Sequence, residues 1–522
     1  MRRFVVARIA VPVAPRTRWR EKEHPMDTIR TNEKQHRVIL QSIARRGMIV
    51  RGLLPDFSPE ALAELDRIQA PAAADGATIR DLTHLLWASI DNDDSRDLDQ
   101  LTVAEVMPGD KVRILVAVAD VDSIVKKGSA IDDHARHNTT SVYTAAMVFP
   151  MLPEKLSTDL TSLNFKSDRL SLVIEMVIGP DGSVRDSQIY RARVRNQAKL
   201  AYNSVAAWLE GNGAVPEAVA AVIALDENLR IQDRAAQSLR NLRHVHGALS
   251  LETIKVKPIF DGDQLRNFEV ENKNRATDII EDFMIAVNGI TAQYLTSRKF
   301  PSIRRVVREP KRWDRIVEIA AEHKFSLPAH PDPKALDEFL IQEKAADPLR
   351  FPDLSLTVIK LLGAGEYIAK LPDDTAPGHF GLAVRDYSHS TAPNRRYPDL
   401  ITQRLLKAAI AGDSWPYGKD ELDALAKHCT EEEDAADKVE RQVDKSAAAL
   451  LLESRINEQF DSIVTGASDK GTWVRLLQMP VEGKLVNGFD GLDVGDRVRV
   501  RLISIDVERG FINFQKAGPS RH

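Results

Sequence analysis

Five carboxylates fall within the nine-residue run from Asp91 to Asp99, and an amide side chain follows at Gln100. Like charges held this close repel one another and raise one another's pKa, unless water or a cation lies among them. Carboxylate and amide oxygens are ligands that hard cations such as Mg²⁺ and Mn²⁺ prefer. Two such ions can activate water, neutralise a scissile phosphate and stabilise the leaving oxygen. The segment therefore indicates metal-assisted hydrolysis of a phosphodiester.

The same residues allow two simpler interpretations, a solvated acidic loop and a calcium site. A calcium-binding EF-hand loop needs glycine at its sixth position and glutamate at its twelfth. Counted from Asp91, those positions hold Arg96 and Thr102, which excludes an EF-hand. Composition alone leaves the solvated loop open.

Two apolar runs flank the acidic segment, LLWASI at 85–90 and VRILVAVADV at 112–121. Such runs predict buried strands, so the carboxylates are expected on a loop between two strands. LSLVIEMVI at 170–178 predicts another strand, because the turn residues Gly-Pro-Asp-Gly follow it. Periodic apolar patterns predict helices at 27–48, 278–295, 399–412 and 430–458.

The end of the chain returns to short strands, GTWVRLL, VEGKLV, DRVRVRLISID and GFINF, separated by glycines and aspartates. This spacing fits a small barrel of the OB type. Arg497, Arg499 and Arg501 alternate with valines and therefore share one face of a strand. A barrel with a basic face and an aromatic side chain such as Trp473 can bind single strands, although a purely structural barrel is the plainer alternative.

Length and composition frame these patterns. A chain of 522 residues, 43% hydrophobic and 28% charged, is expected to form several globular domains. The net charge of −4 means that any RNA-binding surface must gather positive charge locally. Cys429 is the only cysteine, which excludes an intrachain disulfide and fits a reducing cytoplasm. No apolar run approaches the roughly 20 residues that cross a bilayer, so we expect a cytoplasmic protein. We also expect the protein to be a monomer.

Several segments resemble, in the same order, motifs of the ribonuclease II (RNB) family. The acidic segment is similar to the family signature I-D-x5-D-x-D-D, and His137–Tyr143, Phe149–Pro153, Gly378–Leu382 and Thr391–Leu400 match later motifs. The resemblance implies a Mg²⁺- or Mn²⁺-dependent 3′→5′ exoribonuclease, which hydrolyses single-stranded RNA to 5′-mononucleotides.

The resemblance also implies an α+β fold. We expect an extension at 1–25, a helical N-terminal region and linker at 26–80, a large mixed RNB-type catalytic domain at 81–455 and an OB-like RNA-binding barrel at 456–522. Only about 55 residues separate Met26 from the catalytic region, so the two cold-shock barrels of well-known relatives are not expected.

Asp91, Asp97 and Asp99 match three of the four family acids that hold metal and the reacting phosphodiester. The fourth position is Gln100, which offers a neutral oxygen ligand. One metal site is therefore expected to be weaker, or to be supported by another carboxylate such as Asp93 or Asp94. Arg395 matches the arginine of the family motif S-P-I-R-R/K-Y that contacts the phosphate, although this chain reads Ala-Pro-Asn-Arg-Arg-Tyr. A guanidinium there can bridge two phosphate oxygens.

The resemblance assigns further residues to RNA binding. Tyr143 matches a tyrosine that packs on the 3′-terminal base, where a ring stacks on any base, and Tyr202 matches another aromatic residue that holds RNA. One of Glu281 and Asp282 is expected to reach the terminal ribose. The remaining expected RNA contacts are Arg396, Glu440 and Trp473.

Two other functions stay open. Gln100 in place of an acid is compatible with a catalytically impaired RNA-binding regulator that keeps the fold. A metal phosphodiesterase that acts on DNA or small nucleotides would also use these carboxylates.

Overall fold

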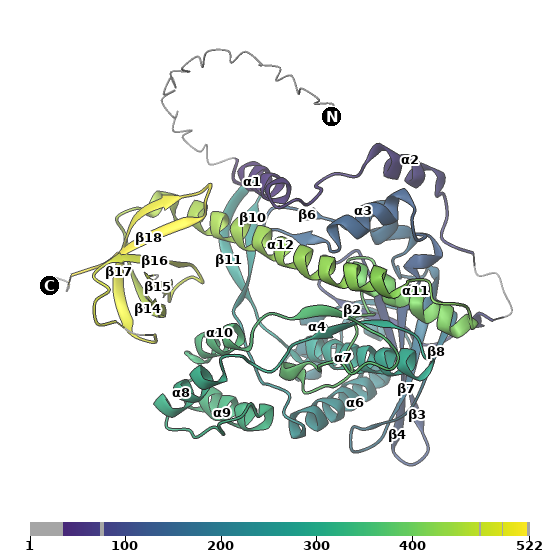
Figure 1. Ribbon diagram of the computed structural model, residues 1–522. Coiled ribbons are helices and arrows are strands. Elements are labelled where there is room, and N and C mark those ends of the chain that lie inside the picture. Colours follow the sequence, from purple (N-terminus) through teal and green to yellow (C-terminus); the bar gives the residue numbers. More distant parts are fainter. Residues whose placement is uncertain (1–34, 74–77, 469–470, 493, 519–522) are drawn as a thin grey trace, which may run out of the picture.

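The computed structural model describes residues 35–73, 78–468, 471–492 and 494–518, and Figure 1 shows how their elements are arranged. The expected extension at 1–25 and the first residues of the helix expected at 27–48 lie outside these ranges. Helix α1 (His36–Val50) covers the rest of that prediction, and α2 (Pro59–Arg67) follows it. Over the described ranges, no helix has the length and apolarity needed to cross a membrane.

A mixed sheet of seven described strands forms the centre, in the order β1-β8-β7-β4-β3-β2-β9. The end pairs β1–β8 and β2–β9 are parallel, and the others are antiparallel. The predicted apolar runs form β4 and β7 in the middle of the sheet, where both faces are covered. The strands are β1 (Arg80–Asp81), β2 (Ala88–Asp91), β3 (Gln100–Met107), β4 (Lys111–Ala119), β7 (Asp168–Ile178), β8 (Val184–Arg195) and β9 (Ala198–Ala201).

Strand β3 corrects one expectation, because the sequence predicted a loop directly between the runs at 85–90 and 112–121. The polar residues Gln100, Thr102 and Glu105 interrupt the apolar pattern of β3 and hide it. Since β3 pairs antiparallel with β2, the acidic segment is a short connection between neighbouring strands. The sheet therefore fixes both ends of the loop that carries the carboxylates.

Helices pack around this sheet. Ile279, Phe283 and Val287 of α7 share one core with β4 and β7, and Leu400 of α11 and Leu425 of α12 belong to the same core. Gly412 follows α11 at a φ of +75°, as expected for a glycine that ends a helix. Helix α12 starts earlier and ends earlier than the predicted 430–458. The helices are α3 (Ala130–Asn138), α4 (Tyr202–Leu209), α5 (Glu217–Ala220), α6 (Leu225–Val245), α7 (Arg275–Ser297), α11 (Tyr397–Ala411) and α12 (Lys419–Leu452).

The C-terminal strands close into a barrel in the order β14-β15-β16-β18-β17, which confirms the OB-like prediction. The sequence did not predict β14. Val498 and Val500 point into the barrel core while Arg497 and Arg499 are exposed. A Cβ at Gly510 would lie 2.6 Å from the Cβ of Lys445, so the barrel packs directly on α12. The strands are β14 (Gln459–Ser468), β15 (Gly471–Leu476), β16 (Glu482–Asn487), β17 (Arg497–Asp506) and β18 (Phe511–Lys516).

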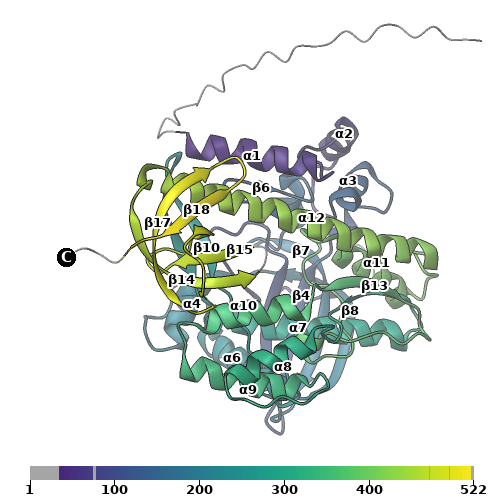
Figure 2. The same cartoon turned by 60° about the vertical axis from the view of Figure 1, so that its left-hand side comes forward.

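A helical lobe lies beside the barrel (Figure 2) and has its own apolar core. Arg475 of β15 pairs with Asp353 of α10 at 2.8 Å, which links the lobe to the barrel. The lobe comprises α8 (Trp313–Glu322), α9 (Pro333–Ala346) and α10 (Phe351–Leu362). The remaining strand pairs are β5 (Val142–Tyr143) with β6 (Val148–Phe149), β10 (Lys255–Asp261) with β11 (Gln264–Glu271), and β12 (Ser302–Val306) with β13 (Glu366–Lys370).

The β10–β11 hairpin reaches the acidic loop. Leu265 and Phe268 of the hairpin share a core with Leu40 of α1 and with α12. Along β10, exposed and half-buried residues alternate, which places Lys255 and Lys257 together on the open face. Nζ of Lys257 lies 2.7 Å from Oδ2 of Asp94, so the hairpin and the loop are joined by an ion pair.

Candidate active site

Local hydrogen bonds hold the acidic loop between β2 and β3. Oδ1 of Asp91 accepts from the hydroxyl of Ser95 and from the backbone N–H of Asn92, each at 2.8 Å. Nζ of Lys199, on β9, donates to the carbonyl of Ser95 at 2.6 Å. Because β9 pairs with β2, the sheet holds the start and the middle of the loop.

Asp99 is buried at the end of this loop, with 2% of its surface exposed. Its Oδ1 accepts two hydrogen bonds from Asn394, one from the backbone N–H at 3.0 Å and one from Nδ2 at 2.9 Å. Its Oδ2 has no hydrogen-bond partner among the described residues and lies 3.4 Å from Nε of Arg395. Burial raises the pKa of Asp99 to about 7, although the nearby Arg395 opposes the rise.

Asp399, in the first turn of α11, holds the loop that precedes this helix and carries Arg395. Oδ1 of Asp399 accepts from the backbone N–H groups of Thr391 at 2.7 Å and Ala392 at 2.8 Å. Nη2 of Arg396 donates to the same carboxylate oxygen at 2.7 Å. The side-chain amide of Gln100 donates to the carbonyl of Thr391. Arg396 and Gln100 thus stabilise the loop that carries Arg395 through hydrogen bonds.

Asp91 and Asp97 lie beside Arg395 and Asp99. Burial raises the pKa of Asp91, while its hydrogen bonds and the charge of Arg395 oppose that rise and Asp97 adds to it. Oδ2 of Asp97 accepts from the hydroxyl of Tyr143 at 3.2 Å. The structure therefore brings the predicted carboxylates and the predicted arginine to one place.

Tyr143, on β5, links this group of charges to helix α12. Its backbone N–H donates to Oε1 of Glu440 at 2.7 Å. Burial raises the pKa of Glu440 to about 7, against the effect of that hydrogen bond. Tyr143 remains 41% exposed and lines an open cleft of about 800 Å³ together with Asp97 and Glu440. Its ring is accessible to a ligand in that cleft.

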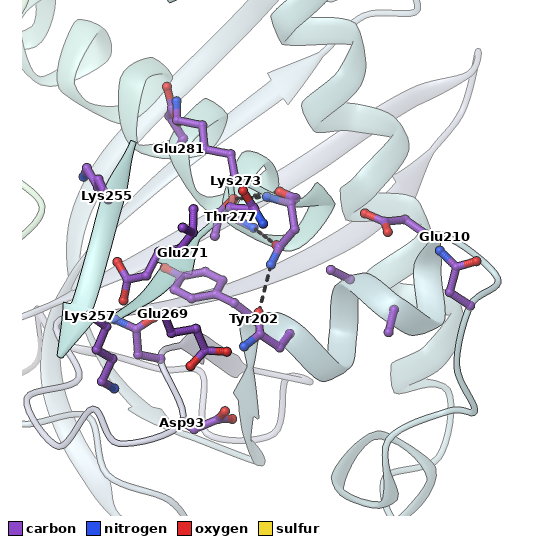
Figure 3. Close-up of a pocket in the computed structure, with 18 residues that line it drawn as sticks. Asp93, Tyr202, Glu210, Lys255, Lys257, Glu269, Glu271, Lys273, Thr277 and Glu281 are labelled. Atoms are coloured by element: carbon purple, nitrogen blue, oxygen red, sulfur yellow. Dashed lines mark hydrogen bonds and ion pairs between the residues drawn. The ribbon is translucent and has the colours of Figure 1, made fainter. Parts of the chain in front are cut away.

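A second cleft, of about 740 Å³, contains Tyr202 and Glu281 (Figure 3). Glu281 pairs with Lys273 at 2.8 Å, and the charge of Asp91 adds to the rise that burial causes in the pKa of Tyr202. Residues that line both clefts are Asn92, Lys255, Lys257 and Glu271. The two clefts therefore meet at the acidic loop and the open face of the β10–β11 hairpin.

Asp282 and Trp473, which were predicted to bind RNA, line neither cleft. The carboxylate of Asp282 is buried and forms ion pairs with Arg240, at 3.2 Å, and with Arg243. Asp282 follows Glu281 on α7, but the two side chains line different pockets. Glu281 lines the cleft of Tyr202, and Asp282 lines a separate pocket with Arg243. Trp473 lies on β15 of the barrel, where Nζ of Lys484 is 5.8 Å from its ring centroid, and it lines neither cleft.

The described residues contain no group of three or more His, Cys, Asp or Glu side chains already gathered as a metal cage. Mg²⁺ does not require one, because it commonly binds one or two carboxylates and completes its shell with water and substrate phosphate. Oδ2 of Asp99 is a buried carboxylate oxygen without a hydrogen bond in the described part of the chain, and Asp91 and Asp97 stand close by. This oxygen-only donor set fits a hard divalent cation.

The geometry agrees with a comparison against known families. A family model described as RNB domain matches residues 79–412. The chain belongs to the RNB family. A second model, described as RNase II-type exonuclease C-terminal S1 domain, matches residues 458–517 and covers the closed barrel.

Curated proteins of the RNB family are also similar in sequence. Ribonuclease R of Vibrio cholerae is 29% identical, with 84% of this chain and 57% of that protein covered. Ribonuclease R of Escherichia coli is 29% identical over 84% of this chain and 58% of that protein, and the Aquifex aeolicus protein is 30% identical over 84% and 64%. The chain thus spans about three-fifths of the length of these relatives.

Solved structures share the RNB fold. Mycoplasma genitalium RNase R in complex with ribose methylated single-stranded RNA superposes with a TM-score of 0.82 at 22% identity, covering 92% of this chain and 78% of that one. Yeast Ssd1, described as a pseudonuclease, gives a TM-score of 0.66 at 16% identity, covering 90% and 57%. The fold alone therefore does not decide between an active and an inactive RNB protein.

Sequence reasoning missed several residues that shape the site. Asn394, Thr161 and Lys199 hold the acidic loop and the arginine loop, and Lys255 and Lys257 line both clefts. A signal existed only for Asn394, which stands where the RNB motif has isoleucine. Lys255 and Lys257 belong to no recognisable motif. Exposed and buried residues alternate in ordinary surface strands as well, so this pattern did not indicate a cleft.

Proposed function

We propose that this RNB-family chain is a hydrolytic 3′→5′ exoribonuclease that releases 5′-mononucleotides from single-stranded RNA. The observation that carries the proposal is the pairing of a buried carboxylate oxygen of Asp99 with Arg395, beside Asp91 and Asp97. Asp97 lines one of the two open clefts that meet at the acidic loop. A cation site and a phosphate-binding guanidinium side by side are what phosphodiester hydrolysis requires.

In this proposal Asp91, Asp97 and Asp99 hold Mg²⁺ or Mn²⁺. When bound, the ion would supply Lewis acidity toward the scissile phosphate and the attacking water. The chain itself holds the three carboxylates in place with the hydrogen bonds of Ser95, Asn394 and Tyr143. Nε2 of Gln100 donates to the carbonyl of Thr391, which leaves its Oε1 as a neutral oxygen, and Gln100 is the fourth proposed ligand.

Arg395 binds the phosphate of the scissile bond. Its side chain is 42% exposed, so the guanidinium remains within reach of a substrate while Nε stays near Asp99. A planar guanidinium can donate to two phosphate oxygens at once and stabilise the charge that grows on them. Arg396 instead stabilises the loop through Asp399, which replaces its expected contact with RNA.

Three residues bind the 3′ end of the RNA. Tyr143 and Tyr202 offer aromatic faces in adjoining clefts, and stacking on such faces accepts any base. The carboxylate of Glu281, in the same cleft as Tyr202, accepts a hydrogen bond from a ribose 2′-hydroxyl, which DNA lacks. Asp282 is set aside, because its carboxylate is already neutralised by two arginines.

Two cations, Lys255 and Lys257, line both clefts among a larger number of carboxylates. The barrel carries the exposed Arg497 and Arg499 and the aromatic ring of Trp473. We assign catalysis to residues 81–455 and single-strand binding to the barrel within 456–522, with the protein acting as a monomer in the cytoplasm. The matched ranges 79–412 and 458–517 support this division.

The test is degradation of a 5′-labelled oligoribonucleotide, with the matched deoxyribonucleotide as a control, in Mg²⁺ and in Mn²⁺. We expect a ladder that shortens from the 3′ end, release of 5′-mononucleotides, and little action on DNA. Binding of RNA without release of nucleotides in either metal would favour the RNA-binding regulator. Equal cleavage of both oligomers would favour a general phosphodiesterase.

A further inference from the structure

We propose that Asn394 is a positioning residue that gives the two oxygens of Asp99 different tasks, one structural and one for ligand binding. The inference rests on the proposed exoribonuclease function and adds a residue to its machinery. It concerns this chain in particular, because the RNB motif has isoleucine where Asn394 stands.

Both donors of Asn394 converge on the same oxygen. The backbone N–H lies 3.0 Å and Nδ2 lies 2.9 Å from Oδ1 of Asp99. The terminal torsion of an aspartate is soft, so a buried carboxylate held by one donor can rotate. Two donors from different directions fix the carboxylate plane, and Oδ2 is left toward Arg395 without a hydrogen bond from any described residue.

The amide of Asn394 is itself oriented by Thr161. The hydroxyl of Thr161 lies 2.5 Å from Oδ1 of Asn394, which leaves Nδ2 as the group that faces Asp99. The hydroxyl oxygen of the next residue, Ser162, accepts a hydrogen bond of 3.0 Å from the backbone N–H of Leu98. One short segment therefore holds Asn394 and also the backbone just before Asp99.

An amide suits this place for electrostatic reasons. Isoleucine would leave Oδ1 with the backbone donor alone, and a carboxylate would repel Asp99. Asparagine adds a donor to a charged acceptor without adding charge to the site. Since Arg395 follows Asn394 directly, the same contact also sets the separation between the guanidinium and Oδ2 of Asp99.

The test replaces Asn394 by leucine, which keeps the branched shape of the side chain and removes the amide. Mn²⁺ binding to the full chain without RNA is measured by electron paramagnetic resonance, and kcat and KM are measured on an oligoribonucleotide. Loss of a residue that orients a metal ligand typically costs 10- to 100-fold in metal affinity or activity. We expect about tenfold weaker Mn²⁺ binding and a lower kcat, with KM for RNA unchanged.

Thr161→Val provides a second variant, which removes the hydroxyl that orients the amide. It should weaken Mn²⁺ binding in the same direction by a smaller factor, and Thr161→Ser should restore the parent value. The matched control is Asn228→Leu, another buried asparagine, whose amide binds the backbone of Ala104. It should lower the melting temperature and leave Mn²⁺ affinity unchanged.

Mn²⁺ affinity within twofold of the parent in both Asn394→Leu and Thr161→Val would overturn the inference. The Mn²⁺ measurement needs no turnover. A parent chain that binds Mn²⁺ but releases no nucleotide would therefore reject the proposed function, while a shifted affinity in the variants would still support the role of Asn394.

Discussion

Nε of Arg395 lies 3.4 Å from Oδ2 of Asp99, and that oxygen receives no hydrogen bond from the described residues. A buried carboxylate normally collects donors on both oxygens, because an unpaired charge in the interior is costly. The arrangement here keeps one oxygen available next to a half-exposed cation. Such a place suits a ligand that brings both positive and negative charge, as a metal-bound phosphate does.

Asp99→Asn should lower kcat by at least about 100-fold, because the amide removes the anionic ligand. RNA binding should stay close to that of the parent, since Tyr143, Tyr202 and the hairpin lysines are untouched. Gel-shift affinity and single-turnover decay of a labelled oligoribonucleotide measure the two quantities. A variant that also loses RNA binding would mean that Asp99 lies in the binding surface and not at the chemical step.

Arg395 and Arg396 should respond differently to substitution although they are neighbours. Arg395→Lys should reduce kcat on the order of 100-fold and leave stability near that of the parent. Arg396→Met should cost about 3 kcal/mol of folding free energy, because it leaves the fully buried carboxylate of Asp399 without its cation. Urea unfolding and kinetics on both variants decide the matter, and the reverse pattern would exchange the two roles.

Tyr143→Ala should lengthen the final fragment that resists degradation, with a smaller effect on the rate of shortening long RNA. Removing the stacking of one base costs about 1–3 kcal/mol, which short substrates cannot compensate with other contacts. Tyr143→Phe is the control, since it keeps the ring and removes only the hydrogen bond to Asp97. An unchanged end product in the alanine variant would remove Tyr143 from the terminal site.

Glu440 predicts a pH-dependent contribution to stability. Burial raises its pKa from 4.5 to about 7, so between these values the folded chain retains a proton that the unfolded chain has released. Its contribution is therefore complete below 4.5 and disappears as the pH rises through 7. Glu440→Gln keeps an oxygen for the N–H of Tyr143 and should be more stable than the parent at about pH 8, with no difference below 4.5. Urea unfolding at both pH values measures this, and a pH-independent difference would contradict it.

Lys255→Ala should weaken RNA binding and make it less sensitive to salt. Removing one phosphate-binding cation reduces the slope of log affinity against log salt by about 0.7 for a single strand. Lys311→Ala, an exposed lysine outside the residues that line the two clefts, serves as the control. If the slope is the same in the parent and both variants, RNA does not pass along the hairpin.

Motif spacing predicted the core of the site well. Asp91, Asp97, Asp99 and Arg395 meet as expected, because motifs of one family mark residues that converge even though Arg395 is far from the acidic loop in the chain. Tyr143 and Glu440 also lie beside them. Their mutual hydrogen bond could not be predicted, since it joins a strand end to a helix 297 residues away in the chain.

The failures concern residues whose partners are distant. Asp282 and Glu281 are equivalent in the sequence pattern, and only the packing of α6 shows that Arg240 and Arg243 neutralise Asp282. For Gln100, the sequence could not show that Nε2 donates to the carbonyl of Thr391, while its role as a ligand through Oε1 stays a prediction. Strand β3 was hidden for a different reason, because Gln100, Thr102 and Glu105 interrupt its apolar pattern.

Helix α12 has a mechanical consequence for the whole molecule. Glu440 holds Tyr143 near the chemistry, and a few residues further on Lys445 meets Gly510 of the barrel. Each helical residue advances the axis by about 1.5 Å and turns it by roughly 100°. Inserting a single residue between these two points would swing the barrel to a different side of the helix. The direction in which the barrel lies from Tyr143 therefore depends on the number of α12 residues between Glu440 and Lys445. An insertion or deletion preserves that direction only if it adds or removes close to a whole number of helical turns.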